Sequence, residues 1–222
     1  LFLSSTGMRW KQIPLTMESI QIMNNVYHQF SFERLYQYYV SILPENSTIV
    51  EIGCFQGNSM CCLAYEIKKS NKQIKCYAID TWEGTLNEPD MMNLDIVKHN
   101  QLYDVFMNNL KRSNLQDYVI PIRKSSLEAV NEFQDQSIDI LFIDADHSYE
   151  AVKADIEFWY PKVKTGGIIS GHDYSPYLSH HNGWPGVVQA VHEKFKDVID
   201  KNNMYPQISQ LCPDCWIVQR LD

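Results

Sequence analysis

The chain has 222 residues, 45% of them hydrophobic and 21% charged, which is enough for one α/β domain of ordinary size. Its formal net charge of −8 argues against a nucleic-acid-binding surface, because contacts with phosphate need clustered lysine and arginine. No apolar run approaches the roughly 18 residues of a membrane helix, and the N-terminal segment lacks the basic flank of a secretion signal. We therefore expect a cytoplasmic protein. Because the first residue is Leu1, the chain could be a processed form or a domain of a larger polypeptide.

The 6 cysteines do not form the pattern of a disulfide scaffold, so we expect a reducing compartment. Cys212 and Cys215 make a lone C-x-x-C motif near the C-terminus. A structural zinc site would need a second pair of ligands, which the sequence pattern does not supply. We interpret these two residues as unremarkable strand-edge cysteines, because a lone spacing motif has a high false-positive risk.

In chain order, the first pattern is an amphipathic stretch rich in aromatic residues, 16–42, which predicts one or two helices. An aromatic stripe of this kind more often packs in a core or a dimer contact than in a ligand site. We take residues 1–46 as a helical segment packed on the core and residues 47–222 as the main domain.

From residue 48 onward, apolar strand patterns alternate with helical ones. Strands are predicted near 48–53, 74–80, 118–124, 138–144 and 167–172, and helices near 58–69, 99–113, 148–160 and 186–198. This alternation implies a parallel sheet covered by helices on both faces. The segments 207–211 and 215–220 read as two closing strands. The loops 83–95 and 175–185 both follow strand ends, so either could cover a small substrate.

The first predicted strand leads into a turn with two glycines, Gly53 and Gly57, just after Glu51. Glycines let a backbone approach a ligand closely, and the helix that follows offers unpaired N–H groups. The spacing Gly-x-x-x-Gly does not match the dinucleotide fingerprint. The next strand ends in Asp80, roughly where a ribose-binding carboxylate lies in open α/β sheets. Together these features favour a nucleotide-like ligand.

Acids and histidines follow two later strands, Asp144 and His147 after one, His172 and Asp173 after the other. If these strands are parallel neighbours, the four side chains meet at one edge of the sheet as a hard-metal site, a general-base site or both. Simpler roles stay open: Asp144 and Asp146 could cap the helix that follows, and His147 could be a structural hydrogen-bonding residue. His172 could be a ligand, a supporting group or a plain strand-end residue.

Taken in order, these motifs resemble a class I S-adenosylmethionine-dependent methyltransferase of the metal-assisted O-methyltransferase type, from about residue 47 to the C-terminus. The resemblance implies a Rossmann-like α/β fold whose seven-stranded, mostly parallel sheet ends in an antiparallel hairpin. It also implies a cofactor site at the strand ends. The matching residues are Glu51, Gly53 and Gly57 for the methionine part, Asp80 for the ribose, Trp82 and Ser126 for the adenine, and Asp146 in a position near the cofactor.

The same resemblance implies the chemistry. Asp144 and Asp173 match the two metal carboxylates of catechol-type, caffeoyl-type and macrolide-sugar O-methyltransferases, and His147 matches the general base. The third metal ligand departs from both patterns. Tyr174 stands where the catechol and caffeoyl enzymes have Asn, and His172 stands where the sugar enzymes have an acid. The expected ligands of Mg²⁺ or a similar ion are therefore Asp144, His172 and Asp173, in the pattern nearer to the sugar enzymes.

The resemblance therefore predicts transfer of a methyl group from S-adenosylmethionine to a hydroxyl of a sugar, on a glycan, a glycolipid or a glycosylated small molecule. A catechol-like small phenol is the second acceptor class. A hypothesis of another kind is a cofactor-binding module without catalysis inside a larger polypeptide. A homodimer is left open.

Overall fold

The structure is a computed structural model that describes residues 31–174, 184–200, 211–212 and 214–221. The strands are β1 (Thr48–Ile52), β2 (Lys75–Asp80), β3 (Ile120–Arg123), β4 (Ile138–Ile143), β5 (Val163–Gly171) and β6 (Trp216–Gln219). The α-helices are α2 (Glu33–Ile42), α3 (Asn58–Ser70), α4 (Pro89–Met92), α5 (Asp95–Lys98), α6 (Leu102–Arg112), α7 (Ser126–Ala129), α8 (Tyr149–Trp159) and α9 (Pro185–Asp200). Three short 3₁₀ helices are η1 (Gln116–Tyr118), η2 (Val130–Glu132) and η3 (Tyr160–Lys162).

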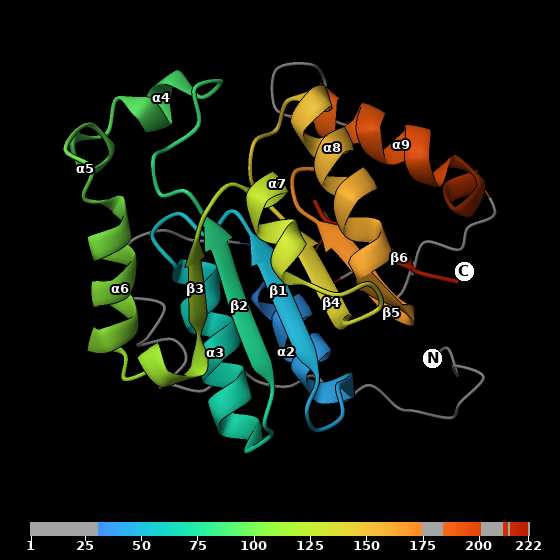
Figure 1. The fold of residues 1–222 in the computed structure, drawn as a ribbon, viewed down its shortest axis with the longest axis horizontal. Coiled ribbons are helices and arrows are strands. Elements are labelled where there is room, and N and C mark those ends of the chain that lie inside the picture. Colours follow the sequence, from blue (N-terminus) through green and yellow to red (C-terminus); the bar gives the residue numbers. More distant parts are fainter. Residues whose placement is uncertain (1–30, 175–183, 201–210, 213, 222) are drawn as a thin grey trace.

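The strands form one twisted sheet in the order β3-β2-β1-β4-β5-β6. The first five are parallel, and β6 pairs antiparallel with β5 (Figure 1). The predicted Rossmann-like sheet with an antiparallel closing strand is thus confirmed. The sheet has six strands in the part of the chain that the structure describes, against the seven expected. The other expected closing strand, 207–211, falls outside the described residues except for Leu211, which lies in a turn.

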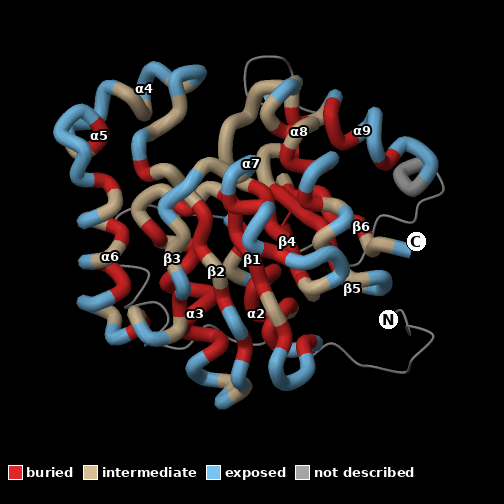
Figure 2. The backbone as a smooth tube through the Cα atoms, viewed as in Figure 1, coloured by how far each residue is buried: buried red, intermediate tan, exposed pale blue. Residues whose placement is uncertain are grey.

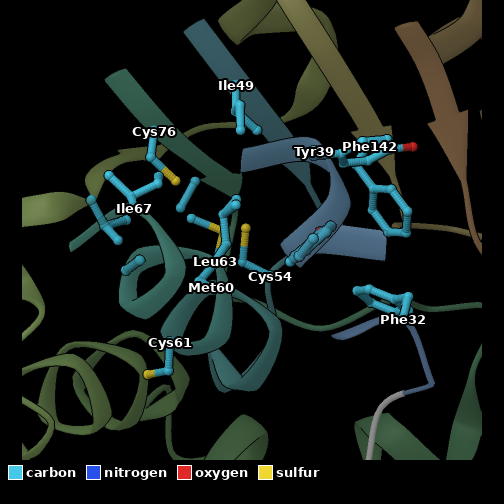
Figure 3. Packing of buried hydrophobic residues seen from close by; sticks show 14 of the residues in the cluster. Phe32, Tyr39, Ile49, Cys54, Met60, Cys61, Leu63, Ile67, Cys76 and Phe142 are labelled. Atoms are coloured by element: carbon cyan, nitrogen blue, oxygen red, sulfur yellow. The ribbon is translucent and has the colours of Figure 1, made fainter. Parts of the chain in front are cut away.

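Both faces of the sheet are buried, because alternate side chains of the central strands point to opposite faces. Ile49 of β1 packs in a core with α2, α3 and α6, while its neighbour Val50 packs in a second core with α8 and α9. Figure 2 shows the buried stretches running along the central strands, with exposed segments at the periphery. Figure 3 shows the first core, where Ile49, Cys76 and Phe142 of three strands face Leu63 of α3. The continuous apolar runs of the sequence therefore reflect strands covered on both sides.

The aromatic stripe near the N-terminus is part of the core, as predicted. Helix α2 packs against α3, and the rings of Tyr36 and Tyr39 are fully buried. The hydroxyl of Tyr39 donates a hydrogen bond of 2.8 Å to Ser170 on β5, which fastens the helix to the sheet. Residues 16–30 of the predicted helical stretch lie outside the described residues, and the boundary at residue 46 stays a prediction.

The two loops expected over the sheet differ in what the structure describes. The loop 83–95 contains the short helix α4 and reaches the start of α5, beside the end of the sheet toward which the arrowheads of β1 and β2 point (Figure 1). Of the loop 175–185, only its last two residues are described. Among the described helices, none combines the length and the apolar character needed to cross a membrane.

Candidate active site

The candidate site lies at the carboxyl ends of the parallel strands, where open α/β sheets bind their ligands. Backbone hydrogen bonds hold the chain together just past the strand ends. The N–H groups of Gly53, Asp144 and His172 donate to the carbonyls of Ile79, Ile52 and Ile143 at 2.8, 2.8 and 3.1 Å. The turns after β1, β4 and β5 are therefore fixed beside one another.

A cavity of about 460 Å³ opens at this edge, a volume within the usual range for small-molecule sites. Five of the residues predicted from the sequence line it, namely Gly53, Asp80, Ser126, Asp144 and Asp146. The turn after β4 and the first part of α8 form another side of the cavity. The structure thus brings most of the predicted cofactor residues to one cavity, although they come from four different segments.

Gly53 is required by the close approach of two turns. Its φ is +84°, and a Cβ atom built on it would lie 2.0 Å from the carbonyl oxygen of Asp144. Any side chain would therefore push the turn after β1 away from the turn after β4. Gly57 has the same φ, but an added Cβ would meet the ring of Phe106 at 2.7 Å, and Gly57 does not line the cavity. Its role is to let α3 begin close to α6.

Asp80 at the end of β2 ties two turns together. One carboxylate oxygen accepts the N–H groups of Cys54 and Phe55 at 2.8 and 2.9 Å, and the other accepts the N–H of Trp82 at 2.7 Å. Burial raises the pKa of Asp80 above its ordinary value, although these three bonds act in the opposite direction. The second oxygen receives a single backbone donor, so it can still accept a hydroxyl from a ligand in the cavity.

Besides Gly57, two further predicted cofactor residues do not line the cavity. Glu51 is fully buried, and its two oxygens accept the hydroxyls of Tyr36 and Ser59, each at 2.5 Å. Burial raises the pKa of Glu51 to about 8, despite these two hydrogen bonds. Trp82 is also fully buried, and its indole N–H donates to the carbonyl of Phe55 at 2.9 Å. Both side chains therefore support the walls of the site, and their placement does not favour the expected contact with a cofactor.

Ser126 leads to an acid that the sequence reasoning missed. Its hydroxyl donates to the carboxylate of Asp155, which also lines the cavity and is 4% exposed. Burial raises the pKa of Asp155 to about 6. Asp155 sits in the middle of α8, next to the buried Ile156. The available signal was an acid on the apolar face of a predicted amphipathic helix.

The four predicted acids and histidines at the ends of β4 and β5 do meet. His147 Nε2 lies 2.8 Å from Asp173 Oδ2 and 3.6 Å from Asp144 Oδ1. His172 Nδ1 lies 3.2 Å from the same oxygen of Asp173 and 3.7 Å from the same oxygen of Asp144. Asp173 has φ +58°, a left-handed conformation that aspartate tolerates better than most residues. We call these four residues the acid–histidine cluster.

The loop after β2 adds further residues to this cluster. Glu88 Oε1 lies 2.7 Å from His147 Nδ1, and the amide of Asn87 donates to Asp146 at 2.9 Å. From another loop, just before α9, the ring of Trp184 stacks on His147, with ring centroids 4.5 Å apart. Sequence reasoning placed these residues only in loops that could cover a substrate, because they follow no periodic pattern. Asp146 also accepts the N–H two residues later at 2.7 Å, so it shapes the start of α8 as well as lining the cavity.

The carboxylates and imidazoles of the cluster set one another's protonation. Burial alone would lower the pKa of His147, but Asp144, Asp173 and Glu88 outweigh it and raise the pKa to about 12. The pKa of His172 is also raised against its burial, chiefly by Asp173. The pKa of Asp173 lies below its usual range because the two imidazoles outweigh burial, whereas burial keeps that of Asp144 raised. In the absence of a cation, protons on the histidines balance the acids.

Three residues of the acid–histidine cluster are arranged so that they could share a divalent cation. Single donor atoms of Asp144, His147 and Asp173 all lie within 4.8 Å of one another. His147 Nε2 is buried and finds no hydrogen-bond partner of acceptable geometry among the described residues, although Asp173 lies so close. A cation would stabilise two carboxylates held this close together, and carboxylate oxygens suit Mg²⁺.

Cys212 and Cys215 are not the unremarkable pair predicted from the sequence. They form a disulfide, and both are buried. They also lie beside His172, so that one donor atom from each of the three residues lies within 4.8 Å of the others. The sequence interpretation was wrong because the spacing alone does not show that the two sulfurs face each other inside the protein, or that His172, just after β5, lies beside them.

Comparison with known proteins agrees with this geometry. Residues 50–174, which include both strand ends of the acid–histidine cluster, match the model of a family described as a methyltransferase domain. The chain belongs to this methyltransferase family. Together with the sheet topology, the match makes the described domain a class I S-adenosylmethionine-dependent methyltransferase domain.

Two curated relatives are uncharacterised. A protein of Sinorhizobium fredii is 31% identical over 128 residues, which are 56% of this chain and 13% of that protein. A protein of Acanthamoeba polyphaga mimivirus is 31% identical over 156 residues, which are 69% of this chain and 62% of that protein. The chain therefore spans less than two thirds of the length of either relative.

Solved structures share the fold. The O-methyltransferase NovP superposes with a TM-score of 0.61 at 17% identity, over 96% of this chain and 85% of that one. The O-methyltransferase from Bacillus cereus in complex with SAH gives a TM-score of 0.56 at 18% identity, over 85% of this chain and 81% of that one. At these identities the likeness concerns the fold alone.

Proposed function

We propose that this methyltransferase domain transfers a methyl group from S-adenosylmethionine to a hydroxyl of a sugar, with the help of a divalent cation. The observation that carries the proposal is the acid–histidine cluster beside the cavity. Two carboxylates stand next to a buried imidazole nitrogen, His147 Nε2, which lies 2.8 Å from Asp173 Oδ2 and 3.6 Å from Asp144 Oδ1. Such a set can hold a cation and accept a proton at the same place.

The cavity supplies the proposed cofactor site. When bound, S-adenosylmethionine supplies an electrophilic methyl group on a positively charged sulfur. Gly53 lines the cavity and lets the turns after β1 and β4 close one side of it, and the free acceptor capacity of Asp80 suits the ribose hydroxyls. Ser126 and Asp155, on another wall, suit the polar edge of the adenine. The solved relative that contains SAH has the same fold, which supports this choice of cofactor.

Asp144 and Asp173 are the proposed holders of the cation, which when bound lowers the pKa of the acceptor hydroxyl. They come from the ends of adjacent strands, so their spacing is set by the sheet rather than by a loop. Main-chain hydrogen bonds fix both ends, and the neighbouring histidines restrain the carboxylates. These residues therefore fix where the acceptor oxygen would sit relative to the cavity.

His147 is the proposed general base. In the neutral imidazole, donation from Nδ1–H to Glu88 leaves Nε2 as the proton acceptor, the arrangement that orients histidine in catalytic triads. Stacking on Trp184 restrains the ring plane. The positive charge of a bound cation would offset the carboxylates that now raise the pKa of His147, so the imidazole could reach its neutral form near neutral pH.

A sugar acceptor is favoured over a catechol-like phenol by the demand for a base. A sugar hydroxyl is much less acidic than a phenol, so its proton has to be removed as the methyl group arrives. The Glu88–His147 pair is suited to that demand. The order Asp-x-x-His followed by His-Asp is also the pattern that most resembles the sugar enzymes.

The test begins with calorimetric titration of S-adenosylmethionine into the protein. Transfer of a labelled methyl group is then measured on a panel of free sugars, glycosides and phenols, with Mg²⁺ or with chelator. We expect transfer to a sugar that stops in chelator and that Asp144→Asn abolishes even with Mg²⁺. Cofactor binding without transfer to any acceptor would favour a non-catalytic module, and transfer only to phenols would favour the second acceptor class.

A further inference from the structure

His172 belongs to a second set of possible metal ligands besides the acid–histidine cluster. Its ring, together with the sulfur atoms of Cys212 and Cys215, offers three donor atoms that lie within 4.8 Å of one another. The pairing of β5 with β6 explains why. Gly171 lies opposite Trp216, so the next residues outward, His172 and Cys215, follow on adjacent antiparallel segments.

The two nitrogens of His172 face different surroundings. Nδ1 lies 3.2 Å from Asp173 Oδ2, on the side of the acid–histidine cluster. Nε2 lies 2.9 Å from the hydroxyl of Ser31, and that hydroxyl lies 3.9 Å from Cys212 Sγ. Metal-binding histidines usually donate their other ring N–H to a carboxylate, which fixes the tautomer and the ring orientation. Asp173 stands where that carboxylate is needed.

The cysteine pair is arranged as a short loop with both sulfurs inside the protein. The N–H of Cys215 donates to the carbonyl of Cys212 at 3.3 Å, which closes the C-x-x-C turn. Cys212 is 0% exposed and Cys215 is 3% exposed, so both cysteines are shielded from solvent, whereas Ser31 is exposed and leaves its side of the site open. The C-x-x-C spacing is one that zinc sites use repeatedly.

We propose that in the reduced protein Cys212, Cys215 and His172 Nε2 bind a soft divalent ion of the Zn²⁺ type. Two thiolates and an imidazole are the donors that such an ion prefers, whereas the carboxylate oxygens of Asp144 and Asp173 suit Mg²⁺. Three protein ligands leave the fourth position to water, next to Ser31. This site lies beyond the proposed methyl transfer and does not depend on it.

The disulfide and the metal exclude each other, because both use the same two sulfurs. In the structure the sulfurs are joined to each other. A phosphine reductant breaks the S–S bond by a two-electron step, in which the two sulfurs gain two electrons and two protons while the phosphine is oxidised to its oxide with oxygen from water. Binding of the metal then displaces both thiol protons to solvent. His172 thus serves the sulfur site and positions Asp173 through Nδ1, rather than acting as the expected third ligand of Mg²⁺.

The experiment uses Co²⁺ as the probe on the full chain, with Mg²⁺ in excess to occupy carboxylate sites. Thiolate ligands give Co²⁺ a charge-transfer absorption in the near ultraviolet, which oxygen and nitrogen ligands do not give. We expect this absorption to saturate at one Co²⁺ per chain after phosphine reduction, to disappear on adding Zn²⁺, and to be absent before reduction. Its absence from the reduced protein would overturn the proposal and leave the pair as a structural disulfide only.

Variants separate the sulfur site from the acid–histidine cluster. Cys212→Ser and Cys215→Ser should each remove the absorption, and Asp173→Asn should weaken Co²⁺ binding by about 10–100-fold, the usual effect of losing the carboxylate behind a ligating histidine. Asp144→Asn should leave the absorption unchanged. The matched control is Cys61→Ala with Cys62→Ala, which removes two buried free thiols from α3 and should also leave it unchanged. Absorption that survives in Cys212→Ser would contradict the assignment.

A measurement on the wild-type protein guards against variants that fail to fold. The reduced protein, with and without Zn²⁺, is treated with an alkylating reagent at a denaturant concentration that makes its buried cysteines reactive in the absence of Zn²⁺, and the modified cysteines are identified by mass spectrometry. We expect Zn²⁺ to protect Cys212 and Cys215 but not Cys61. Equal alkylation of the pair with and without Zn²⁺ would overturn the proposal, whatever the outcome of the methyl-transfer assay.

Discussion

The two halves of the candidate active site differ in how their negative charges are balanced. At the ends of β1 and β2, the carboxylate of Asp80 accepts three backbone N–H groups, which folding puts in place. At the ends of β4 and β5, Asp144 and Asp173 face the rings of His147 and His172, whose positive charge depends on protons taken from solvent. The first half is complete once the chain folds. The charge of the second half changes with pH and, under the function that we propose, with a bound cation.

This difference suits the two tasks that we propose. A cofactor site benefits from fixed hydrogen-bonding groups that need no rearrangement when the ligand arrives. A site that activates a hydroxyl benefits from groups whose protonation can change during the reaction. Substitutions in the two halves should therefore affect different measurements.

The largest effect is expected at His147. His147→Ala should lower turnover by roughly 10²–10⁴-fold, the range typical of a lost general base, while the affinity for S-adenosylmethionine stays nearly unchanged. In the wild type, turnover with saturating Mg²⁺ should rise with pH through one titrating group, because the imidazole has to lose its proton first. Rates and affinities are compared by steady-state kinetics and calorimetry.

The control for this substitution is His99→Ala, at the end of α5, where the ring bonds only to the carbonyl of Asp95 among the contacts described. It should leave turnover unchanged. Loss of Mg²⁺ affinity in His147→Ala would show that His147 is a metal ligand rather than the base.

The next effect is expected in the cofactor half. Asp80→Asn should weaken binding of S-adenosylmethionine by about 1–3 kcal/mol. The substitution replaces one carboxylate oxygen, which accepts hydrogen bonds from the turn or from the ligand, with an NH₂ group, which can only donate. Asp139→Asn is the matched control, since Asp139 also accepts a backbone N–H, that of Thr48 at 2.8 Å, at the start of β4. Calorimetry that finds equal cofactor affinity in both variants would remove Asp80 from the cofactor site.

Substitution of Glu88 should have a smaller effect, and it should act on the acid–histidine cluster at the ends of β4 and β5. Glu88→Gln keeps a hydrogen bond to His147 Nδ1 but removes a charge, so the pKa of His147 should fall and the rise of turnover should move to lower pH. Maximal turnover should drop by about 10–100-fold, the usual cost of losing the carboxylate behind a functional histidine. Glu83→Gln, in the same loop, is the control. A pH profile identical to that of the wild type would separate Glu88 from the proposed base.

The last effect concerns stability rather than catalysis, and it involves Glu51. Its pKa in the folded protein is about 8, above the ordinary 4.5, so the folded protein binds this proton more tightly than the unfolded chain. The stabilisation is therefore complete below pH 4.5 and is lost as pH rises from there through about 8, at up to about 1.4 kcal/mol per pH unit. The free energy of unfolding is measured with denaturant at several values between about pH 5 and pH 8. It should fall less steeply with rising pH in Glu51→Gln than in the wild type. Equal slopes would mean that Glu51 is ionised within the fold.

Much of the fold and of the cluster could be predicted from the sequence, because the informative residues stand where apolar runs end. Asp80 ends a strand, Asp144 and Asp173 each follow one, and parallel strands bring such ends together. Periodicity also predicted the helices that cover the sheet. The order of the strands and the antiparallel position of β6 then follow from the family pattern rather than from any single segment.

The residues that were missed or misplaced depend on contacts between distant segments. Glu88 reaches His147 from a loop, and Asp155 reaches the cavity from the middle of a helix. Trp82 and Glu51 stand at the expected positions, yet their side chains turn into the core. The apolar pattern of the sequence predicts where a strand ends. The direction of a side chain at that end depends on packing against other elements.

The most direct test of the central claim is calorimetric titration of Mg²⁺ into the protein at neutral pH, in two buffers with different heats of ionisation. We propose that a cation bound by Asp144 and Asp173 neutralises their charges in place of the protonated histidines. If so, Mg²⁺ binding should release protons from the histidines. The apparent binding heats should then differ between the buffers in proportion to their ionisation heats. His147→Ala should reduce the number of protons released. Binding of Mg²⁺ with the same heat in both buffers, or no binding at all, would contradict the account.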